Sequence, residues 1–183
     1  MTHRCGFQIN GYNSNTFKIN IKNGGLKMRR NDREVKDIND IIEIIEKCKT
    51  CHVAMIDGDI PYVLPLSFGY EFIDDVLILY FHSAKQGRKI DILNKNNNVC
   101  YEMCFEGDTV FVKDTPCKSG CFYSSIVGTG KVEFINDIQE KCHGLSLLMK
   151  RQTNASVEFN QNQANSVCVF KIISKDFIGK RKE

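Results

Sequence analysis

The chain has 183 residues, of which 42% are hydrophobic and 26% charged, values typical of one globular domain that folds without metal or disulfide cross-links. Its net charge of +3 arises in residues 1–27, which contain no Asp or Glu, so the composition argues against a nucleic-acid-binding face. Nine cysteines, a polar start and the lack of a long apolar run argue against secretion and membrane insertion, and we expect a cytoplasmic protein.

The domain organisation follows from the hydrophobic pattern. Residues 1–27 are rich in Asn and Gly and show no sustained period, so we expect a flexible N-terminal extension outside the fold. Residues 28–183 contain the periodic segments and are expected to form a single domain.

The first periodic segment predicts a helix. Isoleucines recur at helical spacing from Ile38 through Ile41 to Ile45, with charged residues between them. Asp37 is a typical N-terminal capping residue, and the helix is expected to end near residues 47–50.

Three strands are expected next, at residues 52–56, 62–69 and 76–82. The turns between them are marked by Asp57-Gly58-Asp59 and Asp74-Asp75, and this pattern predicts a three-stranded antiparallel meander. Pro65 lacks an N–H group, which places its strand at an edge or a bulge. The third strand is almost wholly apolar and is expected to be buried on both faces.

The second half of the chain alternates between further strands and polar segments. Ser83 and Gln86 have capping-box spacing. The expected elements are a helix at 87–93, strands at 99–105, 109–112, 122–135 and 167–174, a helix at 137–151, a loop at 152–166 and a basic tail at 175–183. Long runs of strands without regular intervening helices favour a mainly β fold with helices, a β-barrel, over a doubly wound sheet.

Several cysteine motifs invite a metal or haem interpretation. The run Cys48-Lys49-Thr50-Cys51-His52 matches the spacing of covalent haem attachment, yet it has no export signal and sits at a helix–strand junction. Cys117 and Cys121 could complete a zinc site, but their spacing differs from a second C-x-x-C pair. Cys100 and Cys104 have an even offset in a strand and should share one face. We expect no metal site.

Two further segments concern phosphate. Gly128-Thr129-Gly130-Lys131 continues as an apolar strand, so it is interpreted as a glycine-kinked barrel strand rather than a phosphate loop. The segment from Ser83 through Gly87 to Arg88 and Lys89 instead follows a buried strand and begins a helix. A helix N-terminus offers free N–H groups to an anion, and Arg and Lys add positive charge.

Three stretches of the chain, in this order, also carry a family resemblance. They are Cys51 to Met55 with Pro61 to Tyr70, Tyr80 to Ala84 with Gly87 to Asp91, and Tyr123 to Lys131. Together they resemble the pyridoxamine 5′-phosphate oxidase-related FMN-binding split-barrel family, in particular its nitroimidazole-resistance branch. The resemblance covers roughly residues 28–181.

The resemblance implies a split β-barrel homodimer with FMN at the subunit interface. The residues it assigns to the cofactor are Val63, Leu64, Pro65 and Leu66 along the isoalloxazine, His82 and Ser83 near the flavin, Gly87, Arg88 and Lys89 at the phosphate, and Ser125 on the opposite wall. Members often carry Arg where this chain has Ser124, so one contact to the anion is expected to be missing.

The expected function is that of an FMN-dependent oxidoreductase that reduces nitroaromatic or related small acceptors. His82 is the candidate catalytic residue because it directly precedes the phosphate cluster. The alternative is a non-catalytic split-barrel protein that binds flavin or haem. Partners are expected to be a second copy of the chain and a small-molecule substrate, with no nucleic acid and no membrane.

Overall fold

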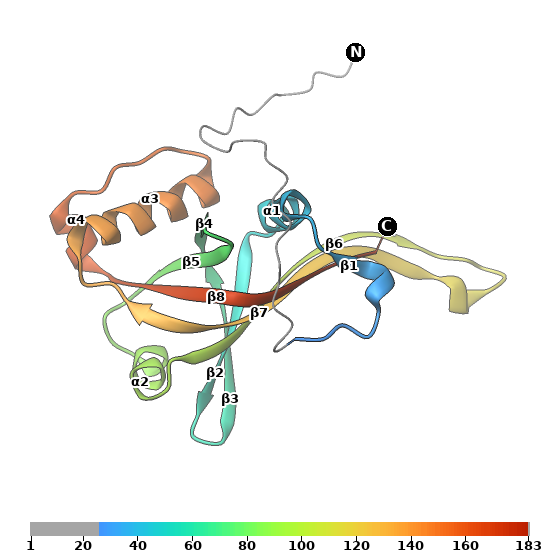
Figure 1. Cartoon of the computed structure of the whole chain (residues 1–183), viewed down its shortest axis with the longest axis horizontal. Coiled ribbons are helices and arrows are strands. Elements are labelled where there is room, and N and C mark those ends of the chain that lie inside the picture. Colours follow the sequence, from blue (N-terminus) through green and yellow to red (C-terminus); the bar gives the residue numbers. More distant parts are fainter. Residues whose placement is uncertain (1–25, 183) are drawn as a thin grey trace, which may run out of the picture.

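One antiparallel sheet, coiled into a split barrel, forms the body of the protein (Figure 1). The structure is a computed structural model that describes residues 26–182, so the extension expected at 1–27 lies, except for its last two residues, outside the described part. The strands of the described part are β1 (Glu34–Val35), β2 (Thr50–Asp57), β3 (Ile60–Ser67), β4 (Gly69–Ile73), β5 (Val76–Ser83), β6 (Asn98–Val110), β7 (Gly120–Phe134) and β8 (Cys168–Lys182). Their order is β3-β2-β6-β7-β8-β5-β4, and β1 pairs with β8.

The helices lie around the coiled sheet and cover part of it (Figure 1). They are α1 (Ile38–Lys47), α2 (Arg88–Lys95), α3 (Ile138–Thr153) and α4 (Gln161–Ser166). The predicted first helix is confirmed. The Asp37 side chain caps it by accepting a hydrogen bond from the Asn39 N–H at 2.8 Å, and the helix buries Ile41, Ile44 and Ile45 in the core. No helix within residues 26–182 is both long and apolar enough to cross a membrane.

The expected three-stranded meander is wrong. β3 pairs with β2, but β5 pairs with β4 on one side and β8 on the other. The reason lies in burial, because five consecutive residues of β5 are buried. A strand that is covered on both faces lies in the interior of a sheet, with a paired strand on each side. The edge position predicted from Pro65 is confirmed, because β3 ends the sheet.

The entry into α2 also differs from its expectation. Ser83 forms no capping box; its hydroxyl donates to the Ala84 carbonyl oxygen at 2.8 Å. Gly87 is the N-cap residue, with φ of 126° and no side-chain capping bond. This φ is accessible mainly to glycine, so the chain turns into the helix through backbone conformation, and the first N–H groups of α2 lack a side-chain acceptor.

The C-terminal half contains longer elements than expected. The two strands expected at 99–105 and 109–112 are one strand, β6, with an irregular register between Glu106 and Thr109. The loop expected at 152–166 contains α4, which begins with an Asn160–Gln163 capping box. The expected basic tail is the second half of β8, because Phe177 and Gly179 face the core between its lysines and arginines.

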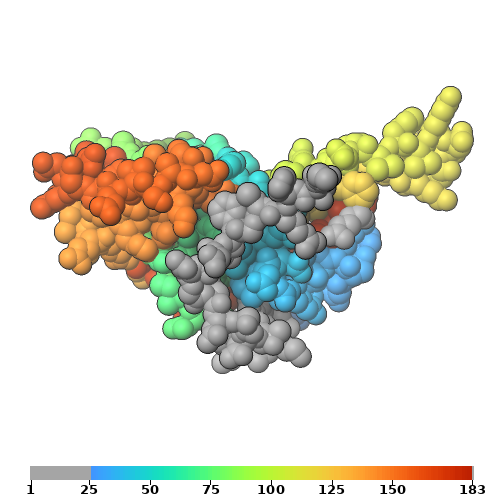
Figure 2. Space-filling model, turned by 90° about the horizontal axis from the view of Figure 1, so that it is seen from above, coloured from blue at the N-terminus to red at the C-terminus, as the bar shows by residue number. Residues whose placement is uncertain are grey.

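A hairpin projects from the body of the molecule (Figures 1 and 2). It is formed by the ends of β6 and β7 and a short turn at Pro116–Lys118. We call residues 105–122 the aromatic arm, because it carries Phe105, Phe111 and Phe122, which are all exposed.

Candidate functional site

The segment from His82 to Lys89 forms a cationic end of the molecule where β5 passes into α2. The Arg88 Nε donates to the Asp57 carboxylate at 2.9 Å, and its guanidinium lies 4.5 Å from the centroid of the Tyr62 ring. Arg88 therefore connects the start of α2 to the hairpin formed by β2 and β3, which brings the two segments expected at one site together.

Electrostatics at this end favour an anion. Lys89 Nζ lies 6.0 Å from the centroid of the Phe170 ring and has no carboxylate partner among the described residues; burial lowers its pKa. The pKa of His82 is also lowered. Desolvation of the imidazole is the larger cause, although His82 is partly open to solvent, and the positive charge of Lys89 lowers the pKa of His82 further. At neutral pH the site therefore combines a neutral imidazole with cationic side chains.

The residues expected along the flavin ring divide between two faces of β3. Leu64 and Leu66 pack against the hydrophobic core, whereas Val63 is 52% exposed and Pro65 is exposed. This alternation follows from the period of two in a strand, so only Val63 and Pro65 can meet a ligand from the outside.

Val63 belongs to a row of outward-facing side chains that crosses four strands. The register pairs Val63 with Ala54, Ala54 with Cys100 and Cys100 with Thr129. We call this side of β3, β2, β6 and β7 the outer face. Cys104 and Ser125 pair with each other further along it, and the exposure of Cys100 and Cys104 confirms that they share this face.

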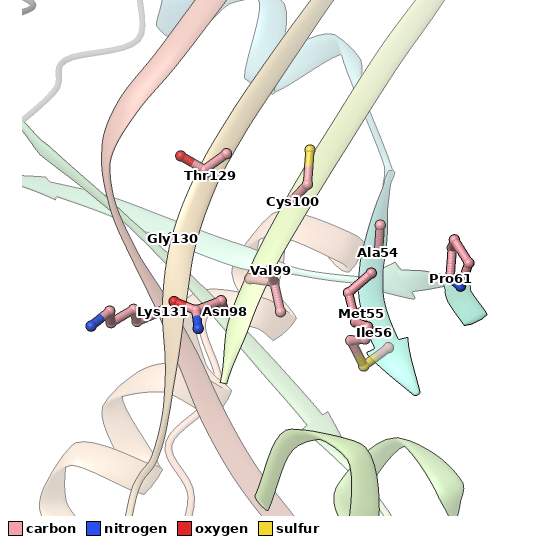
Figure 3. Close-up of a pocket in the computed structure, with 10 residues that line it drawn as sticks. All are labelled: Ala54, Met55, Ile56, Pro61, Asn98, Val99, Cys100, Thr129, Gly130 and Lys131. Atoms are coloured by element: carbon pink, nitrogen blue, oxygen red, sulfur yellow. The ribbon is translucent and has the colours of Figure 1, made fainter. Parts of the chain in front are cut away.

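A hollow of about 460 Å³ lies on the outer face (Figure 3). Its walls come from β2, the start of β3, and the paired segments of β6 and β7, and they include Ile56, Pro61, Cys100 and Lys131. Sequence reasoning missed this hollow, since strand registers bring these residues together and a single sequence does not specify registers. The alternation within each strand indicates which of its residues face outward, but it does not indicate which strands are neighbours.

Ser125 is not brought to the cationic end within one chain. On β8, Ser125 pairs with Lys180, whereas His82 pairs with Val169. At about 3.3 Å per residue, these positions are on the order of 30 Å apart along the strand. Its neighbour Ser124 points inward, is 4% exposed, and its hydroxyl has no hydrogen-bond partner among the described residues.

The cysteine motif near the first helix has a structural role. Cys48 and Cys51 are buried, and burial raises the pKa of the Cys48 thiol to about 11, so it is a thiol at neutral pH. His52 Nδ1 lies 3.1 Å from the Glu102 carboxylate across the sheet. Within the described residues, no group of His, Cys, Asp and Glu side chains could hold a metal ion.

The expected glycine-kinked strand is confirmed at residues 128–131, which lie within β7 where its pairing with β8 shifts register. A Cβ on Gly128 would come within 2.3 Å of the Tyr101 ring. The glycine therefore allows the buried tyrosine to pass under the strand, and the segment has no helix that could bind phosphate.

The fold defines the class as a split-barrel protein, and its cationic end lies at the junction of β5 and α2. The family model described as pyridoxamine 5′-phosphate oxidase matches residues 37–179, and the chain belongs to this family. No curated protein matches the sequence.

Solved structures show the same fold. A protein of Bacteroides thetaiotaomicron, provisionally named a 5-nitroimidazole antibiotic resistance protein, is 33% identical with a TM-score of 0.69; the match covers 82% of this chain and 90% of that chain. A flavocytochrome of Azotobacter vinelandii has a TM-score of 0.70 at 17% identity, covering 86% and 72%. An FAD-binding protein of Mesorhizobium loti has a TM-score of 0.58 at 20% identity, covering 82% and 98%.

Proposed function

We propose that the protein binds FMN at a homodimer interface and acts as an oxidoreductase that reduces nitroaromatic or related small acceptors. The observation that carries the proposal is the cationic end, where Arg88 and Lys89 begin a helix that has no side-chain cap. Membership of the family and the likeness to the Bacteroides protein support the same proposal.

The residues at the cationic end fit a phosphate dianion. The first N–H groups of α2 and the positive end of its dipole are free to meet an anion. Lys89 supplies a point charge without a carboxylate partner in the described structure, and Arg88 can offer its guanidinium while it stays stacked on Tyr62. Ser83 and Gly87 complete this end of the proposed site.

The outer face fits a flat ring and a second subunit. Val63 and Pro65 present an apolar edge next to the hollow, and apolar surface of this kind favours ligand and partner binding. Since Ser125 is remote from the cationic end of its own chain, it can serve as the opposite wall only from a second subunit. The proposed site is therefore shared between two copies of the chain.

Within this proposal the bound flavin supplies the redox chemistry, and the protein supplies binding, orientation and electrostatics. His82 is the proposed catalytic residue. The lowered pKa of His82 keeps its imidazole neutral at neutral pH, so a ring nitrogen can accept a hydrogen bond or a proton beside the reacting acceptor.

The colour and redox behaviour of the purified protein test the proposal. A flavin absorption spectrum, reduction by NAD(P)H and reoxidation by a nitroimidazole support an FMN-dependent reductase. A strong Soret band instead identifies a haem protein. Bound flavin that exchanges no electrons with either reagent identifies a non-catalytic carrier, and a colourless protein that does not take up added FMN overturns the cofactor assignment.

Variants of the cationic end locate the phosphate. Replacing Arg88 and Lys89 together with Ala should weaken FMN binding by about 3–6 kcal/mol, because two charge-assisted contacts of roughly 1.5–3 kcal/mol are removed. Affinity is measured by quenching of flavin fluorescence. Unchanged affinity would place the anion elsewhere. His82→Ala should lose turnover, and a variant whose FMN binding and turnover are both intact would remove His82 from the mechanism.

A further inference from the structure

The aromatic arm exposes several large apolar side chains, and Phe111 is the most exposed of them. Phe111 is 72% exposed, Val110 44%, Phe105 41% and Phe122 37%. The outer part of the arm stands away from the body of the molecule (Figure 2). At its base, Phe105 lies with its ring centroid 5.9 Å from Lys47 Nζ of α1, so the outer part with Phe111 is the part left uncovered. Apolar clusters of this kind on a soluble protein usually mark an interaction surface.

A second exposed apolar set lies at the hairpin formed by β2 and β3. Ile60 is 65% exposed, Val63 52% and Ile56 46%. This hairpin borders the hollow on the outer face, which Ile56 also lines, and its Asp57 and Tyr62 contact Arg88 at the cationic end. The second set therefore sits directly beside the proposed flavin site.

The two sets cannot meet within one chain. The β2–β3 hairpin pairs with β6 near Cys100, and the arm begins at Phe105 and follows the same strand to its end at Val110. At about 3.3 Å per residue they are roughly 15–35 Å apart along β6. In a two-fold symmetric dimer, however, a contact between two different patches occurs twice, once in each direction.

Charge is also complementary between the two sets. Lys131 lines the hollow beside Ile56 and has no carboxylate partner among the described residues. Glu106 and Asp108 on the arm are exposed and form no ion pair with a basic side chain within residues 26–182. Opposite charges at the rim of an apolar contact favour the correct alignment of two surfaces.

We infer that the aromatic arm of each subunit packs on the β2–β3 hairpin of the other subunit and covers the hollow on its outer face. The inference rests on the proposed flavin-binding homodimer and assigns to the arm the closure of the partner's cofactor site. Phe111 on the arm and Ile56 on the hairpin, which is 46% exposed and lines the hollow, are the residues that make this contact. The arm therefore stabilises the dimer and slows release of the flavin.

Sedimentation of the full chain, with and without FMN, tests the contact through two single variants. Phe111→Ser and Ile56→Ser should each raise the dimer dissociation constant about tenfold or more and accelerate FMN release from the loaded protein. The double variant should have a smaller effect than the product of the two, because both changes remove one contact. Each variant should stay folded, with the circular dichroism spectrum of the wild type.

Ile73→Ser is the matched control, because Ile73 is 47% exposed but ends β4 at the other edge of the sheet. If Phe111→Ser and Ile56→Ser dimerise like this control, the arm contact is overturned while the flavin proposal stands. If the wild type sediments as a monomer, the homodimer and the arm contact both fall. If the arm variants weaken the dimer but the wild type takes up no FMN, the contact holds and the cofactor assignment fails.

Discussion

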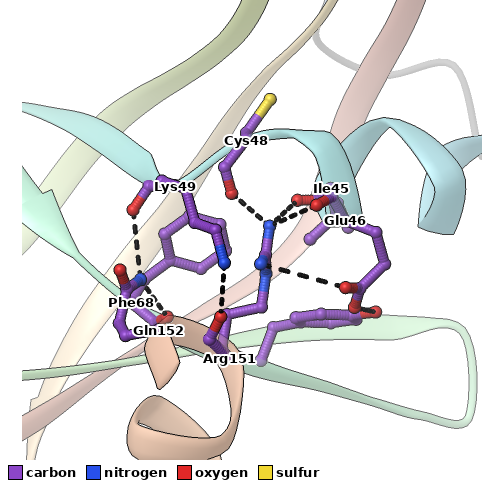
Figure 4. Close-up of polar contacts among 8 residues, drawn as sticks. Ile45, Glu46, Cys48, Lys49, Phe68, Arg151 and Gln152 are labelled. Atoms are coloured by element: carbon purple, nitrogen blue, oxygen red, sulfur yellow. Dashed lines mark hydrogen bonds and ion pairs between the residues drawn. The ribbon is translucent and has the colours of Figure 1, made fainter. Parts of the chain in front are cut away.

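Arg151 shows how one buried charge joins two helices that are remote in sequence. It lies in α3 and is 7% exposed, and its Nη2 donates to the carbonyl oxygens of Ile45 at 2.6 Å, Glu46 at 2.8 Å and Cys48 (Figure 4). The last carbonyls of a helix lack intrahelical donors, and a cation there also complements the helix dipole. Arg151 therefore completes the C-terminal end of α1.

Replacing Arg151 with Ala should lower the free energy of unfolding by about 3 kcal/mol, because buried carbonyl oxygens lose a charged donor. Urea denaturation measures the change. Lys150→Ala is the control, since its side chain is exposed on the same helix and its removal should be nearly neutral. Equal stability of the two variants would show that water replaces the guanidinium.

His82 carries a pH dependence of predictable sign. The pKa of His82 is lowered in the folded protein, so its contribution to stability is complete above the unfolded value of about 6.5 and is lost as the pH falls toward the folded value. The second cause of this shift is the positive charge of Lys89. Lys89→Met should therefore raise the pKa of His82, as followed by NMR titration of its imidazole. An unchanged pKa would show that the charge of Lys89 does not act on His82.

At the scale of elements, close contact between α3 and β4 depends on a missing side chain. A Cβ on Gly69, the first residue of β4, would lie 2.4 Å from the backbone N of Leu148 and 2.7 Å from the carbonyl carbon of Leu147. Helix backbone cannot yield locally, so α3 is seated directly on the strand at this point, and its shift would disturb the buried Leu148.

Gly69→Ala should lower the free energy of unfolding by about 1–3 kcal/mol through overpacking. Gly120→Ala provides the comparison, because the nearest atom to its Cβ would be the Lys182 Nζ at 2.3 Å, the mobile end of a long side chain. The urea midpoint should fall clearly for Gly69→Ala and barely for Gly120→Ala. Similar midpoints would mean that α3 moves freely over β4.

The basic tail expected at residues 175–183 is a strand up to residue 182 because of its pairing partners. The alternation in residues 175–182 places Phe177 and Gly179 on the core face, but these residues carry so many lysines and arginines that composition suggested a tail. The outcome depends on β7 and β1, which pair with this part of β8. A partner strand that is distant in sequence thus decides whether a basic segment becomes a strand.

At the scale of the whole molecule, the proposed site requires two chains, since Ser125 and the cationic end are far apart within one. Apparent FMN affinity should therefore fall when the protein is diluted below its dimer dissociation constant, because dissociation removes one wall of the site. Flavin fluorescence over a dilution series measures this effect. Affinity that is independent of protein concentration would locate the whole site in one subunit.

Several local features follow from the sequence alone: the α1 helix from its isoleucines, the edge position of β3 from Pro65, and the positive charge at the start of α2 from Arg88 and Lys89. Each depends on neighbours in sequence, through periodicity, a missing N–H group or helix-end charge. Three features become visible only in the folded chain: β5 lies between β4 and β8, Cys100 and Thr129 line one hollow, and Ser125 is remote from Arg88. Strand pairing between distant segments decides these features, and pairing depends on which faces must be buried together.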